Sequence, residues 1–143
     1  MIDVERIRSV IPHRYPFLLV DKIIEINEDE TACVGLKNVT INEKVLNGHL
    51  PGKSIFPYPM LVEHMAQVGC YLLMKKPDSE GKIAYFAAID EVEFTKPVVP
   101  GDTIITKVEL LTGRRGIWKI KAESKVDGEL VCCGNLTCAL VDK

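Results

Sequence analysis

Apolar and polar residues alternate along most of the chain, which is the pattern of half-buried β-strands. Between residues 117 and 126, apolar and small side chains at the even positions from Trp118 to Ser124 alternate with charged ones at the odd positions from Lys119 to Lys125. Period-2 patterns and runs rich in β-branched residues predict six strands, at 17–27, 31–39, 82–94, 102–111, 117–126 and 130–141. A polar turn at 28–30 joins the first two strands, and Asp127-Gly128 predicts a tight hairpin between the last two.

Residues 59–74, PMLVEHMAQVGCYLLM, do not fit the strand pattern and predict a helix. Pro59 can occupy the first helical position, where its missing N–H costs nothing. Lys75 and Lys76 suit the negative end of the helix, and Pro77 stops it. The predicted helix has about 16 residues and is roughly 24 Å long. Because it is apolar nearly all round, it must be enclosed by protein.

Six strands with one buried helix after the second strand predict an α+β protein, in which an antiparallel sheet curls around the helix. No linker, repeat or low-complexity segment divides the chain, so we expect one domain over residues 1–143. One sheet cannot enclose such a helix completely. We therefore expect the chain to pair with a second subunit.

The composition is that of a soluble globular protein, with 47% hydrophobic and 27% charged residues. A net charge of −2 gives no reason to expect nucleic acid or an anionic membrane as a partner. Residues 1–14 do not form a secretion signal, and the apolar stretch 60–74 is shorter than the roughly 20 residues of a membrane span. Five cysteines without CxxC spacing favour reduced, mostly buried thiols in the cytoplasm rather than a metal site, and no motif marks any of them as a nucleophile.

His49 stands in a loop, Asn47-Gly48-His49-Leu50-Pro51-Gly52, that two glycines and a proline make rigid. A histidine held there can act as an acid or a base near neutral pH, or it can simply bond to backbone. Glu63 follows within the apolar helix, on the same side as Gln67 and Cys70. It is either a raised-pKa general acid paired with His49 or a buried carboxyl satisfied by hydrogen bonds or at a subunit seam.

Seven segments carry a more specific signal: 12–21 (PHRYPFLLVD), 37–43 (KNVTINE), 48–52 (GHLPG), 63–67 (EHMAQ), 84–90 (AYFAAID), 94–102 (FTKPVVPGD) and 116–118 (GIW). In this order they resemble the FabZ-type 3-hydroxyacyl-[acyl-carrier-protein] dehydratases. The resemblance implies a hot-dog fold, in which a curved antiparallel sheet wraps a long helix. It also implies homodimers, often arranged as trimers of dimers, with acyl carrier protein as the partner that delivers the substrate.

The resemblance further implies removal of water from a 3-hydroxyacyl thioester, with no metal or redox cofactor. His49 of one subunit would be the base, and Glu63 of the other would protonate the departing hydroxyl group. The N–H of Tyr58, at the helix start, would hold the thioester oxygen. Tyr85 matches a gate at the mouth of the acyl tunnel, or is simply an aromatic residue on a strand. His13 is expected to have a structural or tunnel-lining role.

The chain departs from the family at the start of the helix. Tyr58 stands where the family has the glycine whose N–H is expected to bind the thioester oxygen, and Pro59 replaces the following valine. A tyrosine there adds bulk, and it would be strained if the site needed a positive φ. His64 replaces the usual alanine and points about 100° away from Glu63, so we expect it to be a satisfied interior histidine.

Two other functions compatible with the resemblance remain open. An isomerase that converts trans-2 to cis-3 enoyl chains would use the same base with a differently shaped tunnel. A catalytically weak acyl-thioester binding protein would result if Tyr58 blocked the site. A hot-dog thioesterase fits the seven segments less well.

Overall fold

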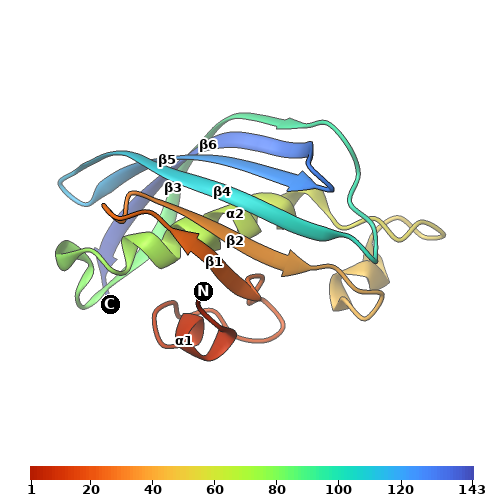
Figure 1. Cartoon of the computed structure of the whole chain (residues 1–143), viewed down its shortest axis with the longest axis horizontal. Coiled ribbons are helices and arrows are strands. Elements are labelled where there is room, and N and C mark those ends of the chain that lie inside the picture. Colours follow the sequence, from red (N-terminus) through yellow and green to blue (C-terminus); the bar gives the residue numbers. More distant parts are fainter.

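The computed structural model describes all residues, 1–143, and shows one six-stranded antiparallel sheet curved around a long helix (Figure 1). The strands are β1 (Lys22–Ile26), β2 (Ala32–Asn38), β3 (Lys82–Phe94), β4 (Thr103–Arg114), β5 (Ile117–Val126) and β6 (Glu129–Asp142). The helices are α1 (Val4–Arg8) and α2 (Tyr58–Leu73), with 3-10 turns η1 (Lys44–Gly48) and η2 (Pro77–Ser79). Across the sheet the order is β1-β2-β4-β5-β6-β3. The predicted α+β, hot-dog architecture is confirmed.

Helix α2 is the centre of the hydrophobic core. Leu61, Met65, Val68 and Leu72 are completely buried, and the helix packs against β2, β4 and β5. The helix has the predicted length, but it begins one residue earlier than expected, so Pro59 is its second residue. That position also tolerates proline, because the first N–H groups of a helix have no partner within it.

The first strand is shorter than predicted, because residues 17–21 are not part of the sheet. Part of the backbone of this apolar run bonds to side chains of α2 instead of to a neighbouring strand. The N–H of Leu19 donates to Gln67 Oε1 at 2.8 Å, and the carbonyl of Phe17 accepts from Gln67 Nε2 at 2.8 Å. A buried backbone group needs a partner, but that partner need not be another strand.

The short helix α1 was not predicted. Its N-terminus is capped by the side chain of Asp3, which accepts from the N–H of Arg6, and Ile7 is its buried residue. The hairpin between β5 and β6 is as predicted, with Asp127 and Gly128 both at positive φ, 51° and 81°. Such a two-residue turn matches the twist of the strands that it joins.

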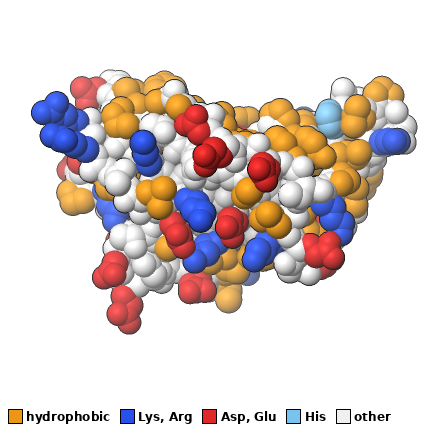
Figure 2. Space-filling view, turned by 90° about the horizontal axis from the view of Figure 1, so that it is seen from above, with side chains coloured by type: hydrophobic (Ala, Val, Ile, Leu, Met, Phe, Trp, Pro, Cys, Tyr) orange, Lys and Arg blue, Asp and Glu red, His pale blue; other side chains and the backbone are white.

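Strand β3 forms one edge of the sheet and presents an apolar surface to solvent. Tyr85, Phe86, Ile89 and Phe94 are 56%, 40%, 50% and 38% exposed. Seen from above, hydrophobic side chains gather in a band along one margin of the molecule (Figure 2). A long apolar edge is a site of association with another chain. Neither helix is long and apolar enough to cross a membrane.

Helix and sheet approach each other closely at Gly35, where a Cβ atom would lie 2.4 Å from Cγ2 of Val68. We predict that Gly35→Ala lowers the free energy of unfolding by about 1–3 kcal/mol, because the well-packed helix must shift. Urea unfolding monitored by circular dichroism measures this change. Gly48→Ala is the matched control, since a Cβ there meets nothing within 4 Å. Equal stabilities of the two variants would contradict the prediction.

Candidate active site

Glu63, in the second turn of α2, lies in the wall of a cavity of about 290 Å³. The cavity opens between α2, the loop before β1 and the strands β3 and β6. Most of its lining is apolar: Pro12, His13, Phe17, Glu63, Ala66, Gln67, Cys70, Ile83, Ala84, Tyr85, Phe86 and Cys138. A mostly apolar cavity with a few convergent polar groups is the usual form of a small-molecule site.

The carboxyl group of Glu63 is held on one side only. Its Oε1 accepts a hydrogen bond from Nε2 of Gln67 at 2.8 Å, and Nε2 of His13 lies 3.6 Å from the same oxygen. Burial raises the pKa of Glu63, and the hydrogen bond from Gln67 opposes that rise in part. Its Oε2 has no partner within the chain. A carboxyl group with a raised pKa and a free oxygen is suited to donate a proton into the cavity.

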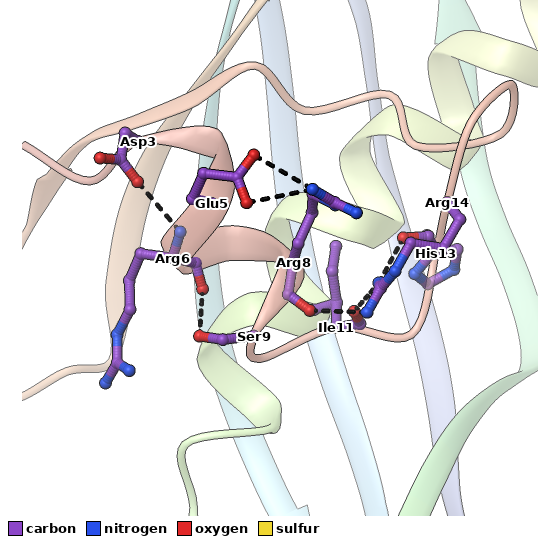
Figure 3. Close-up of polar contacts among 8 residues, drawn as sticks. All are labelled: Asp3, Glu5, Arg6, Arg8, Ser9, Ile11, His13 and Arg14. Carbon is purple, nitrogen blue, oxygen red and sulfur yellow. Dashed lines mark hydrogen bonds and ion pairs between the residues drawn. The ribbon is translucent and has the colours of Figure 1, made fainter.

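His13 reaches the cavity from the loop before β1. Arg14 holds that loop by donating hydrogen bonds to the carbonyls of Arg8, Ile11 and His13 at 2.7–2.9 Å (Figure 3). Desolvation, and secondarily the charge of Arg14, lowers the pKa of His13, so its ring is neutral around neutral pH. The side chain is only 21% exposed, which fits the expected cavity-lining role.

His49 follows the turn η1 and is not part of this cavity. No hydrogen bond or ion pair joins His49 to Glu63 within the chain. The loop that carries His49 is anchored through η1, because buried Lys37 of β2 forms an ion pair with Glu43 at 2.8 Å. The left-handed backbone of Leu50 and Gly52, with φ of 50° and 81°, then turns the chain after the histidine. His49 therefore makes no contact with Glu63 of its own chain.

Tyr58 is the first residue of α2 and has a negative φ, so its backbone is not strained. Its N–H makes no hydrogen bond, because Pro57 has no side-chain acceptor that could cap the helix. The carbonyl of Pro57 accepts only from the N–H groups of Met60 and Leu61. Its ring stacks on Phe94, with the centroids 4.4 Å apart and the planes at 5°. The stack borders a second apolar groove, of about 370 Å³, which Glu63 and Phe86 also line.

The sequence pattern did not show that two residues, Gln67 and His13, contact the carboxyl group of Glu63. Gln67 orients Glu63, and His13, expected only to line the tunnel or to have a structural role, lies beside the Glu63 carboxyl although the two residues are 50 positions apart. Tyr85, for which a gating role was expected, lines the cavity and is exposed. His64 is completely buried, as expected, but only one of its nitrogens is satisfied: Nδ1 lies 2.7 Å from the carbonyl of Leu19, and Nε2 has no partner.

All five cysteines are free, and two of them, Cys70 and Cys138, line the cavity with Glu63. Burial raises the pKa of Cys70 to about 12 and that of Cys138 to about 11. Such thiols are poor nucleophiles, because the thiolate is the reactive form. No group of three or more histidine, cysteine or acidic side chains is arranged to hold a metal ion.

The fold and this half-open cavity define a hot-dog protein with a carboxyl group at its site. A FabA-like domain matches residues 11–135. Over its full length the chain is 46% identical to the 3-hydroxyacyl-[acyl-carrier-protein] dehydratase FabZ of Bacillus cereus strain AH820, of which it covers 99%. It is 47% identical to the protein of the same name from Bacillus mycoides strain KBAB4, with the same coverage. The chain therefore belongs to the FabZ family of FabA-like proteins.

Solved structures of lower sequence identity share the fold. The dehydratase heterocomplex ApeI:P from Xenorhabdus doucetiae gives a TM-score of 0.80 at 18% identity, covering 96% of this chain and 91% of that one. A hypothetical thioesterase with coenzyme A from Streptococcus pneumoniae gives a TM-score of 0.64 at 14% identity, covering 95% and 91%. At these identities the likeness concerns the fold alone.

The raised pKa of Glu63 makes stability depend on pH. The folded chain binds the carboxyl proton of Glu63 more tightly than the unfolded chain does. The free energy of unfolding therefore falls as pH rises from the ordinary pKa of a glutamate to the raised pKa of Glu63. We predict that Glu63→Gln has a higher free energy of unfolding than the wild type at about pH 7, and that the difference narrows near pH 4. Urea unfolding at both pH values measures this. Exposed Glu28→Gln is the control, and a difference independent of pH would contradict the assignment.

Proposed function

We propose that this protein removes water from 3-hydroxyacyl thioesters of acyl carrier protein to give trans-2-enoyl thioesters, as its relatives' names state for them. The observation that carries the proposal is Glu63, a carboxyl group with a raised pKa and a free oxygen in the wall of an apolar cavity. The apolar lining suits an acyl chain, and the carboxyl suits a hydroxyl leaving group. We place the reaction in fatty-acid synthesis, in the cytoplasm, with residues 1–143 as one domain.

The reaction needs one proton removed and one delivered. His49 takes the proton from C2 of the substrate, and the electrons form the double bond as the C3–O bond breaks. Glu63 gives its proton to the departing hydroxyl, which leaves as water. The negative charge that develops on the thioester oxygen is stabilised by the free N–H of Tyr58 at the positive end of α2. The proton on His49 then returns to Glu63 through solvent, which completes the cycle.

The site requires two subunits, because His49 and Glu63 do not meet within one chain. We propose a homodimer in which the exposed edge of β3 pairs with β3 of a second copy, which would bury Tyr85, Phe86 and Ile89. This arrangement brings His49 of the second copy to Glu63 of the first. Three such dimers forming a hexamer is the larger assembly that we expect.

We predict that His49→Ala and Glu63→Gln each lower kcat/KM for a 3-hydroxyacyl thioester of acyl carrier protein by about a thousandfold, because each removes a proton-transfer group. Formation of the enoyl thioester is followed by its ultraviolet absorbance or by mass spectrometry. Wild-type protein that binds this substrate without turnover would instead support the binding-protein alternative. Formation of a cis-3 product from a trans-2 enoyl thioester would support the isomerase.

The same two variants test whether the site is shared between subunits. Refolding them together in equal amounts makes half of the dimers mixed, and each mixed dimer has one intact site. We predict recovery of about a quarter of the wild-type activity. Each variant refolded alone is the control. No recovery on mixing would mean that both residues act from the same chain.

The dimer is tested at the centre of β3, where Ile89 is 50% exposed. We predict that Ile89→Glu separates the dimer into folded monomers, because two like charges would face each other across a desolvated interface. Turnover should then fall about a hundredfold or more, because His49 of the second copy no longer lies beside Glu63. Sedimentation velocity and circular dichroism measure assembly and folding. Leu111→Glu, at a similarly exposed position of β4, is the control. A dimeric, active Ile89→Glu protein would exclude this interface.

A further inference from the structure

We propose that His64 is a positioning residue for the dehydration, because it donates a hydrogen bond to the carbonyl of Leu19. Leu19 in turn fixes the orientation of the Gln67 amide. In that orientation the amide donates to Oε1 of Glu63 and leaves Oε2 free for the substrate. This inference deepens the proposed function and rests on it for the role of Glu63 as acid. His64 itself does not touch the substrate, since it is completely buried and lines neither the cavity nor the groove.

The first step is the backbone of Leu19, which α2 grips at both of its polar groups. The N–H of Leu19 donates to Oε1 of Gln67 at 2.8 Å, and its carbonyl lies 2.7 Å from Nδ1 of His64. A carbonyl can only accept, so Nδ1 of His64 carries the hydrogen and donates. Leu19 is therefore fixed between two consecutive turns of the helix.

The second step is the orientation of the Gln67 amide. Because the N–H of Leu19 must meet the amide oxygen, the amide nitrogen faces the other way, toward the carbonyl of Phe17 and Oε1 of Glu63, both at 2.8 Å. Turning the amide over would replace these three contacts with donor–donor and acceptor–acceptor pairs. Since Oε1 already accepts a hydrogen, the acidic proton of Glu63 resides on Oε2, the oxygen without a partner.

The third step concerns why a histidine stands here. Burying the ring leaves Nε2 without a partner, which costs stability, so another contact of the ring must account for a histidine at this position. Desolvation, with a contribution from the charge of Lys37, lowers the pKa of His64 to about 4, so the ring remains neutral and keeps its single donor at Nδ1. What His64 adds is the bond to Leu19, in a segment that the sheet does not hold.

Without that bond, only the N–H of Leu19 still joins this residue to the polar groups of α2, so the Gln67 amide is held less firmly as the donor to Glu63. The hydrogen bond from Gln67 lowers the pKa of Glu63, so its loss shifts that pKa further upward. The other titratable groups that face Glu63 come from four elements and, in the proposed dimer, from the second copy: His13 from the loop, Tyr58 and Cys70 on α2, Tyr85 on β3, Cys138 on β6, and His49 of the second copy. Replacing His64 changes none of them.

Three variants separate the donor from the bulk of the ring. The amide nitrogen of asparagine can take the place of Nδ1, whereas that of glutamine lies one bond further out, near the place of Nε2. We expect His64→Ala and His64→Gln to lower kcat about tenfold with little change in KM, as for a lost hydrogen bond, while His64→Asn stays within about twofold of the wild type. The alkaline limb of the kcat profile, where Glu63 loses its proton, should move to higher pH in the first two variants only.

A matched control tests whether lost stability alone explains such effects. Leu72→Ala empties a buried position two turns further along the same helix and should destabilise the fold without moving the alkaline limb. Wild-type kcat and pH profile in His64→Ala would overturn the inference, as would equal losses in His64→Asn and His64→Gln.

A second measurement does not depend on turnover. The carboxyl carbon of Glu63, labelled with ¹³C, is titrated by nuclear magnetic resonance in the wild type and the three His64 variants. A midpoint raised in His64→Ala and restored in His64→Asn supports the positioning role, and identical midpoints reject it. If the wild-type protein forms no enoyl thioester, the proposed function fails, whereas this titration still decides the role of His64.

Discussion

The rest of the structure depends on one constraint: α2 is enclosed by the sheet, so polar groups on it must find partners in the protein. Gln67 and Nδ1 of His64 find them in the backbone of residues 17–19, a segment that precedes β1 and contacts the helix instead of pairing in the sheet. That contact brings the preceding loop, with His13, alongside Glu63 and closes one side of the cavity. The backbone groups that bond to the polar side chains of the buried helix thus also shape the site. A substitution that disturbs these hydrogen bonds therefore also alters the surroundings of Glu63.

Much of the fold follows from local patterns, and the exceptions have a physical cause. The strands after α2 were predicted closely, because the period of two is clear in segments such as 117–126, which bury one face. Residues 17–21 were wrongly predicted as strand, since an apolar run shows burial but not which groups satisfy its backbone. Helix α1 was missed because its five residues bury only Ile7, too few for a helical period.

Some features of the candidate site can be predicted from the sequence. The loop of His49 and the carboxyl of Glu63 are visible in the sequence because a charged residue in an apolar helix and a histidine between glycines are locally unusual. The role of Gln67 is not visible, since it depends on a contact with Leu19, 48 residues away. The strain considered for Tyr58 does not arise, because that residue begins the helix with ordinary backbone angles and stacks on Phe94. No local pattern could show that stack.

The two thiols in the cavity wall have a consequence for the lifetime of the enzyme. A trans-2-enoyl thioester is an electrophile, and an ionised thiol beside it would add to the double bond and inactivate the protein. Burial keeps the pKa of Cys70 and Cys138 at about 12 and 11, so roughly one in ten thousand or fewer is ionised at neutral pH. The same dry lining that accommodates an acyl chain thereby protects the protein from alkylation by its own product.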